Sequence, residues 1–176
     1  ALTKSGQEEE GIKQLEMAYQ LNPRDRIILS ALAGKCIEAG NFDTAINLLE
    51  QGTFLFPQSA QMHDKLSYVF AKAGNYSQSL AHAREAVKLD PKLVSAKINL
   101  GSALLMKGNC QEAKSIYQET TSIDPKNADA HFLLATTMER LGDTSGARSE
   151  LTTFLELANK SDPRLTKAKE KLDSLK

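Results

Sequence analysis

The 176-residue chain has no tryptophan, only two cysteines and three histidines, and no excess of either charge, since 22 Lys and Arg balance 22 Asp and Glu. A nucleic-acid-binding protein normally shows a basic excess or a basic stripe, so this balance argues against that class. No apolar run approaches the roughly 18 residues of a membrane-spanning helix. Hydrophobic residues make up 41% and charged residues 25%, a globular composition that argues against disorder.

Motifs that carry chemistry are also missing. The sequence contains no glycine-rich phosphate-binding loop, no paired-cysteine metal motif and no nucleophile motif. Because function must be argued from a site, and no catalytic site is visible, the sequence predicts that the chain is not an enzyme. We expect no catalytic residue, no metal and no cofactor.

What the chain does have is a period of 34 residues, kept by five glycines and by four of the five prolines. The positions are Gly6, Gly40, Gly74, Gly108 and Gly142 for glycine, and Pro23, Pro57, Pro91 and Pro125 for proline. Glycine and proline interrupt regular structure more strongly than other residues. A fixed period of this length therefore indicates one small structural unit copied along the chain.

Each period holds two apolar stretches with helical spacing, for example about 25–38 and about 42–54. Apolar residues at offsets of three, four and seven indicate amphipathic helices, and no stretch alternates long enough to suggest a strand. Glycine in the turn between the helices can take the left-handed conformation that commonly ends a helix. Proline suits the boundary between units because it lacks an N–H group. The pattern predicts an all-α fold built of helix pairs.

Residue size repeats with the same period. Large leucines recur beside small residues, at Leu32, Leu66, Leu100 and Leu134 and at Ala33, Ser67, Gly101 and Ala135. Small side chains at a fixed place let facing helices approach closely. This helix–turn–helix unit, with Leu, small, large and Pro positions at fixed offsets, resembles the tetratricopeptide repeat over nearly the whole chain. The resemblance implies a right-handed superhelical α-solenoid of antiparallel helix pairs.

The resemblance also implies where the repeats lie in a single array. Full repeats are expected at residues 26–59, 60–93, 94–127 and 128–161. Residues 1–25 would be the second helix of a truncated repeat, with its turn at Gly6, so we interpret the chain as a segment of a longer protein. We expect the second helix of the last repeat to extend to about Ala158. Residues 162–176, with Pro163 at the first helical position, would form the polar-backed capping helix that such arrays need.

The histidines and cysteines fit a structural role. His63 and His131 fall at equivalent repeat positions, 68 residues apart, so they cannot share a metal, and each is interpreted as a half-buried structural imidazole. His82 is expected at the surface of a second helix. Cys36 and Cys110 lie in different repeats, beyond the about 5.5 Å that a disulfide requires, and are interpreted as small buried apolar residues.

The resemblance further implies a binding face. In this family the first helices of successive repeats line a concave groove in which partner peptides lie. The matching positions here are Ile27, Gln61, Asp64, Tyr68, Lys72, Ile98, Asn99, Ser102, Leu105, Asp129, Phe132, Thr136 and Glu139, with Ser30, Gly34 and Ser95 beside them. Four of them stand out as large and apolar on a face otherwise expected to be exposed to water, which favours a contact site: Tyr68, Ile98, Leu105 and Phe132. The alternative is that one or two fold back against an adjacent helix.

The groove residues also limit the partner. Co-chaperones of this family hold an acidic chaperone tail with a clamp of lysine, arginine and asparagine, and only Asn99 fits that pattern here. Asp64, Asp129 and Glu139 should repel an acidic tail, so a neutral or basic, partly apolar peptide or helix is expected.

The sequence therefore predicts a protein–protein interaction scaffold or adaptor that binds a partner peptide or helix in its concave groove. Two alternatives stay open. One is a structural module that self-associates through its N-terminal end, where Leu2, Ile12 and Met17 lack neighbours, or that packs on an upstream domain. The other is the substrate-recruiting segment of a larger enzyme. No nucleic acid and no membrane insertion are expected, and the unpaired cysteines lean slightly toward the cytoplasm.

Overall fold

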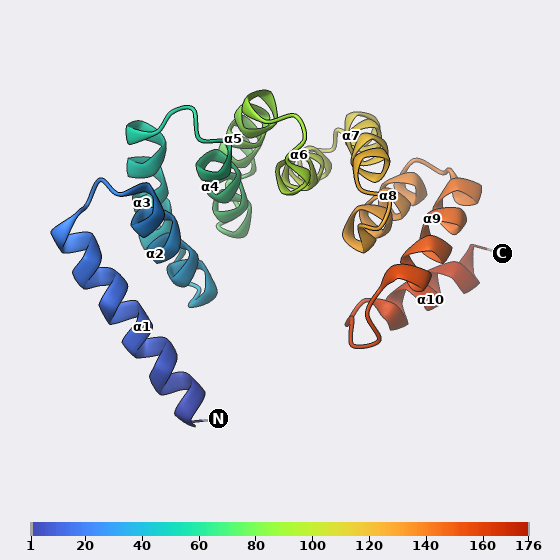
Figure 1. Ribbon diagram of the computed structural model, residues 1–176. Coiled ribbons are helices and arrows are strands. Elements are labelled where there is room, and N and C mark those ends of the chain that lie inside the picture. The colour runs from blue at the N-terminus through green and yellow to red at the C-terminus, as the bar shows by residue number, and fades with distance from the viewer. Residues whose placement is uncertain (1, 176) are drawn as a thin grey trace. The chain divides into compact units, whose positions relative to one another are not determined.

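The computed structural model describes the backbone of residues 2–175 and the side chains of residues 10–175. Regular structure in these residues consists of ten α-helices and no strand (Figure 1). The helices are α1 (Leu2–Leu21), α2 (Arg26–Glu38), α3 (Phe42–Leu55), α4 (Ala60–Lys72), α5 (Tyr76–Leu89), α6 (Val94–Met106), α7 (Cys110–Ile123), α8 (Ala128–Arg140), α9 (Thr144–Leu157) and α10 (Leu165–Ser174). They form two compact units, unit 1 (residues 1–90, α1 to α5) and unit 2 (residues 91–176, α6 to α10).

The 34-residue period sets the helix ends. The first helices of the pairs, α2, α4, α6 and α8, each have 13 residues and begin where the period predicts. The second helices, α3, α5, α7 and α9, each have 14 residues. The turn glycines have φ between 75° and 83°, in the left-handed region that other residues rarely adopt. They are Gly40, Gly74, Gly108 and Gly142.

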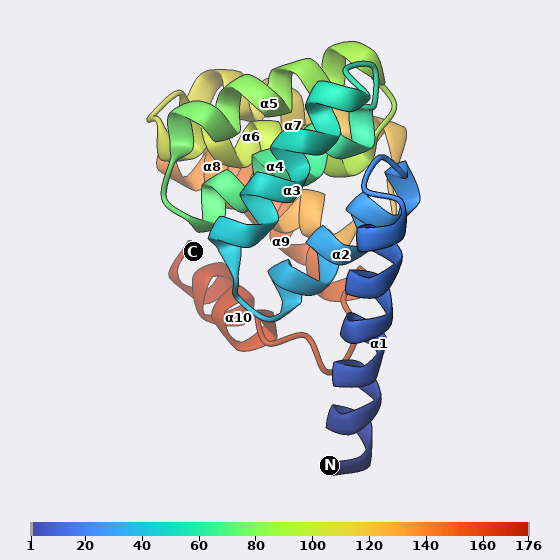
Figure 2. The same cartoon turned by 90° about the vertical axis from the view of Figure 1, so that its left-hand side faces the viewer.

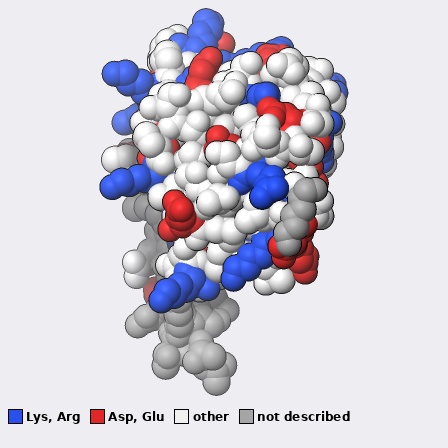
Figure 3. All heavy atoms as spheres, turned by 90° about the vertical axis from the view of Figure 1, so that its right-hand side faces the viewer, with Lys and Arg blue, Asp and Glu red and all other residues white. Residues whose placement is uncertain are grey.

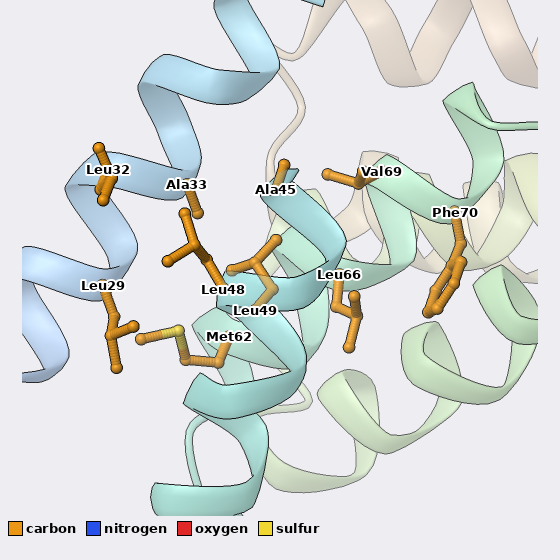
Figure 4. Close-up of a cluster of buried hydrophobic side chains, with 10 residues drawn as sticks. All are labelled: Leu29, Leu32, Ala33, Ala45, Leu48, Leu49, Met62, Leu66, Val69 and Phe70. Carbon is orange, nitrogen blue, oxygen red and sulfur yellow. The ribbon is translucent and has the colours of Figure 1, made fainter. Parts of the chain in front are cut away.

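The core of unit 1 is built from the repeated large and small positions (Figure 4). Ala33 on α2 and Ala45 on α3 are fully buried, and Leu29, Leu49 and Leu66 fill the space beside them with no exposed surface. Close packing of this kind makes even a one-methyl change in volume costly. The core therefore fixes α2, α3 and α4 against one another.

Helix α1 lies alongside α2 in both ribbon views (Figures 1 and 2). Its C-terminal half is also tied to α3, because the Tyr19 hydroxyl donates a 2.6 Å hydrogen bond to Oε1 of Gln51. The Nε2 group of the same glutamine donates to the Pro23 carbonyl at 3.2 Å. These bonds hold the loop between α1 and α2 on the end of α3.

In unit 2 a glycine makes room for an aromatic ring. A Cβ atom placed on Gly101 of α6 would lie 2.5 Å from a ring carbon of Tyr117 on α7. The ring is fully buried, and its hydroxyl lies 3.0 Å from Oγ of Ser102. Burial raises the pKa of Tyr117. The expected pairing of a small residue with a large one is therefore confirmed at this position.

Two expected helix boundaries were wrong, and the second helix of the last repeat is no longer than the others. Helix α1 continues from Leu2 through Gly6, so no turn forms there. Helix α9 ends at Leu157, as the other second helices do at their equivalent positions, because Ala158 takes an extended conformation (ψ 141°). Helix α10 begins at Leu165, two residues after Pro163.

A turn delays the start of α10. The Asp162 carboxylate accepts hydrogen bonds from the backbone N–H and the side chain of Arg164, each at 2.9 Å. These bonds hold the pKa of Asp162 down at about 2. The proline between them therefore lies in the turn and not in the helix.

Candidate functional site

Unit 1 exposes a hollow between the first turns of α2 and α4, with a volume of about 430 Å³. We call it the α2–α4 hollow. Its lining residues are Arg26, Ile27, Ser30, Ala31, Ser59, Gln61, Met62 and Lys65. Two of them, Ile27 and Gln61, belong to the predicted groove. The hollow therefore lies on the helix face that the sequence assigned to partner binding.

The hollow has an apolar part whose position follows from how the two helices begin. Asp25 caps α2, since its Oδ1 atom accepts from the backbone N–H groups of Ile27 at 2.7 Å and Ile28 at 3.1 Å. The first turn is thereby fixed with Ile27 turned outward, and this residue is 75% exposed. On the other side, Ser59 caps α4 by accepting from the N–H of Met62, whose side chain is buried. An exposed isoleucine and a buried methionine thus share one hollow.

Two cations line the same hollow. Nζ of Lys65 reaches from α4 to α2, where it donates a 3.2 Å hydrogen bond to the carbonyl of Ser30. Arg26 is exposed at the start of α2. None of the lining residues, all of which the structure describes, is acidic. The sequence analysis assigned no binding role to either cation, although Lys65 lies four residues after Gln61 and so shares its helix face.

The other groove residues of unit 1 lie further along α4. Tyr68 is 38% exposed, and Nζ of Lys72 lies 5.2 Å from the centroid of its ring. Gln61 is exposed and Asp64 is half-buried. All five predicted residues of this unit are therefore at least partly accessible.

On α6 of unit 2 the predicted residues are less uniform. Ile98 and Asn99 are half-buried, and Ser102 is engaged with the hydroxyl of Tyr117. Leu105 is only 9% exposed, so the expectation that it presents an apolar surface was wrong. Its side chain contributes to the folded interior.

On α8 the predicted apolar contact residue is also covered. Phe132 is 9% exposed because its ring packs on Phe154 at a centroid distance of 5.0 Å and belongs to a cluster with Ala168 of α10. The guanidinium of Arg164 lies over the same ring at 5.3 Å. For Phe132 the alternative of packing against an adjacent helix is the one observed.

The carboxylates on α8 are paired by residues from the C-terminal segment. Nη2 of Arg164 lies 2.5 Å from Oδ1 of Asp129, and Lys171 of α10 forms an ion pair with Glu139. Thr136 donates to the Phe132 carbonyl within its own helix, at 2.9 Å. A neutral or basic partner was expected because of the carboxylates of Asp64, Asp129 and Glu139. Two of these, Asp129 and Glu139, already have a basic partner within the chain.

The ion pairs of Arg164 with Asp129 and of Lys171 with Glu139 give two of the basic residues near the C-terminus an acidic partner on α8. Residues 160–176 hold six basic and three acidic residues. Figure 3 shows basic and acidic side chains intermingled on the face toward the viewer.

The histidines are paired in a way the sequence analysis missed. His82 was expected at the surface, but it is half-buried and lies stacked against both His63 and Phe70. The two Nδ1 atoms of the histidine pair lie 3.1 Å apart, and Nε2 of His63 lies 3.2 Å from the Pro57 carbonyl. Burial, and secondarily the His63 ring, lowers the pKa of His82.

The equivalent pair in unit 2 has a different partner. Nε2 of His131 lies 3.0 Å from the Pro125 carbonyl, and its Nδ1 lies 2.6 Å from Oε2 of Glu150. His63 and His131 are both 9% exposed, so each is a buried structural imidazole. The spacing of 19 residues between partners is the same in both pairs, and this repetition was the available signal.

A metal site, a membrane-spanning helix or paired cysteines would each point to a further role, and the described residues hold none of them. No group of three or more His, Cys, Asp or Glu side chains among them is arranged to hold a metal ion. Within the same residues, no helix combines the length and the apolar character that crossing a membrane requires. Cys36 and Cys110 are half-buried free thiols, and burial raises the pKa of Cys36.

Comparisons with known proteins agree with this architecture. A family model described as tetratricopeptide repeat matches residues 2–67 and 104–172. No curated protein sequence matches the chain significantly.

Solved structures show the same fold at low identity. MamA from Desulfovibrio magneticus RS-1 is 20% identical with a TM-score of 0.77, over 91% of this chain and 90% of that one. TTC0263, a thermophilic TPR protein of Thermus thermophilus, is 17% identical with a TM-score of 0.75, over 99% and 93%. YrrB, described as a TPR protein with an unusual peptide-binding site, is 19% identical with a TM-score of 0.74, over 97% and 87%.

Proposed function

Because the chain belongs to the tetratricopeptide repeat family and has the all-α solenoid fold of its relatives, we propose that it is a protein-interaction scaffold. In this proposal it binds a peptide or helix of a partner protein and carries out no catalysis itself. Four full repeats, at residues 26–59, 60–93, 94–127 and 128–161, make up the array. The peptide-binding site described for YrrB supports the same use of the fold here.

The α2–α4 hollow is the observation that carries the proposal. A large apolar side chain, Ile27, is 75% exposed at the edge of a cavity instead of on a flat surface. Exposed apolar side chains beside a pocket are typical of places where a partner inserts an anchor residue. Gln61, Tyr68 and Lys72 extend the contact along α4. Phe132 and Leu105, which are buried, take no part in it.

Affinity capture tests the proposal directly. The 176-residue chain is compared with the double variant Ile27→Asp, Tyr68→Ala in capture from a lysate of the source cells, read by mass spectrometry. The matched control is Phe54→Asp, because Phe54 is 85% exposed on α3 and lies outside the predicted face. All three chains are first checked for equal helicity by circular dichroism.

We expect the parent and the control to enrich the same partner and the double variant to lose it. If all three chains capture the same proteins, the contact lies elsewhere and the proposed site is wrong.

Self-association is a second candidate, favoured by exposed apolar side chains on α1. Met17 is 63% exposed and Leu21 is 87% exposed, whereas Ile12 is half-buried. The side chain of Leu2, also expected at this end, lies outside the described residues. Light scattering over a range of concentrations separates the candidates, since a mass that stays monomeric rules out self-association.

A further inference from the structure

We propose that the α2–α4 hollow selects an acidic internal segment of the partner, in which an Asp or Glu side chain is held by Arg26 and Lys65 and a neighbouring apolar side chain packs on Ile27. This inference rests on the proposed function and names the chemistry of the ligand at the same site. It replaces, for unit 1, the neutral or basic partner expected from the sequence.

The charges around the hollow are the first argument. Arg26 stands on α2 and Lys65 on α4, so one cation comes from each of the two helices that line the hollow. The Lys65 ammonium donates to a backbone carbonyl, which leaves its charge uncompensated by a carboxylate of the lining. Electrostatic complementarity across an interface favours a partner of opposite sign. An acidic group therefore fits this hollow better than a basic one.

The acidic residues next to these cations in the sequence do not compete for them within the hollow. Asp25 directs Oδ1 at two backbone N–H groups of its own helix. Asp64 is not among the residues that line the hollow. The site is thus left with two cations and with acceptors only from backbone, hydroxyl and amide groups.

The apolar part of the lining is the second argument. Ile27, Ala31 and Met62 line the same hollow as the cations. A carboxylate alone would leave this apolar surface in water, and an apolar side chain alone would leave the cations without a counter-charge. A ligand that presents both groups side by side satisfies both parts, because burial of apolar area and charge pairing then occur together.

A second hollow favours an internal segment over a chain end. It has a volume of about 290 Å³ and is lined by Arg26, Phe56, Pro57, Gln58 and Ser59. Because it shares Arg26 and Ser59 with the α2–α4 hollow, a bound chain can continue past the cation into it. A carboxylate at a chain terminus would not need this second space.

A random library of short peptides, displayed on phage with no free C-terminus, tests the inference. It is selected against four forms of the 176-residue chain: the parent, Ile27→Asp, the charge reversal Arg26→Glu with Lys65→Glu, and a control reversal, Lys167→Glu with Lys169→Glu. The control changes the same total charge at exposed positions of α10. Helicity of each form is checked first, and if the reversal is poorly helical the neutral pair Arg26→Gln with Lys65→Gln replaces it.

We expect the parent to enrich peptides with Asp or Glu next to an apolar residue. Synthetic copies of these peptides should bind the charge-reversal form at least about tenfold more weakly than the parent, and the control reversal equally well. They should also lose binding to Ile27→Asp.

Contrary outcomes separate this inference from the proposed function. Peptides that depend on Ile27 but lack acidic residues, and bind the parent and the charge reversal equally, would overturn the inference and leave the scaffold proposal standing. If binding of synthetic peptides requires a free C-terminal carboxylate, the internal segment is wrong. If no selected peptide depends on Ile27, both the inference and the proposed site fail.

Discussion

The first helices of the two units present different faces, one open and one covered. In unit 1 the face of α2 and α4 is open, with Ile27 75% exposed beside two cations. In unit 2 the face of α8 is covered, since Phe132 is 9% exposed beneath Arg164, and Asp129 is paired with the same arginine. Phe132 occupies the repeat position of Ser30 and Asp64, which are half-buried in unit 1. The repeat position alone therefore does not decide how far a side chain is buried. What packs on the helix decides it.

Removal of the two apolar side chains should show the largest difference between the faces. Phe132→Ala should lower the free energy of unfolding by about 3–5 kcal/mol, because it leaves a cavity between Phe154 and α10. Ile27→Ala, at an exposed position, should change it by less than about 0.5 kcal/mol. Urea unfolding followed by circular dichroism measures both. Similar losses of unfolding free energy for the two variants would mean that Phe132 is not more deeply buried than Ile27 in solution.

Alanine substitution at one helical glycine of each unit should change the stability by a smaller amount, and in opposite directions. In Gly101→Ala the new methyl group would meet the Tyr117 ring at 2.5 Å, and overpacking of this kind costs about 1–3 kcal/mol. In Gly34→Ala on α2 the nearest atom is Nζ of Lys65 at 3.8 Å, so the gain in helix propensity of about 1 kcal/mol should remain.

Thermal unfolding should therefore show a lower midpoint for Gly101→Ala and a higher one for Gly34→Ala. If both variants are stabilised, the tyrosine ring has room to move and α6 and α7 are less tightly packed than the structure shows.

The histidine pair of unit 1 should add a smaller, pH-dependent effect. Burial lowers the pKa of His82 below its ordinary value of 6.5, so the unfolded chain binds more protons than the folded one as pH falls. The stability associated with neutral His82 is present above pH 6.5 and is lost as the pH falls from there through the folded-state pKa. His82→Gln keeps a donor for Nδ1 of His63 but does not titrate.

Urea midpoints measured from about pH 7.5 to about pH 5 should fall more steeply for the parent than for His82→Gln. Parallel curves for the two chains would show that the proton is taken up elsewhere.

Local features of the fold could be predicted from the sequence because they depend on nearby residues. The first helices α2, α4, α6 and α8 begin at the expected repeat starts, and α3 extends one residue beyond its expected end. Glycine and proline set these limits through backbone conformation, which needs no knowledge of the rest of the chain. Helix α9 ends one residue before the expected Ala158, but it is no longer than the other second helices, because Ala158 is extended although no proline follows.

The accessibility of the candidate site could be predicted only in part. Ile27 and Tyr68 were placed correctly on an accessible face, since helical spacing decides which way they point. Phe132 was not, because its burial depends on the direction in which the turn at Asp162 sends α10. That direction is fixed by side-chain hydrogen bonds to Arg164, and repeat spacing carries no information about them.

The packing of α10 on its neighbour has a consequence for the order in which the chain is made. Within each unit, helices pack mostly on those next to them in the chain, so little loop-closure entropy opposes folding. Unit 1 has all its own contacts once residue 90 has left the ribosome. The cover of Phe132 by Phe154 and Ala168 is complete only when α10, which begins at Leu165, has also emerged. Nascent chains that end after α8 (Ala128–Arg140) but before α10 should therefore expose the apolar ring of Phe132 between Asp129 and Glu139, where a chaperone or a basic helix can bind transiently.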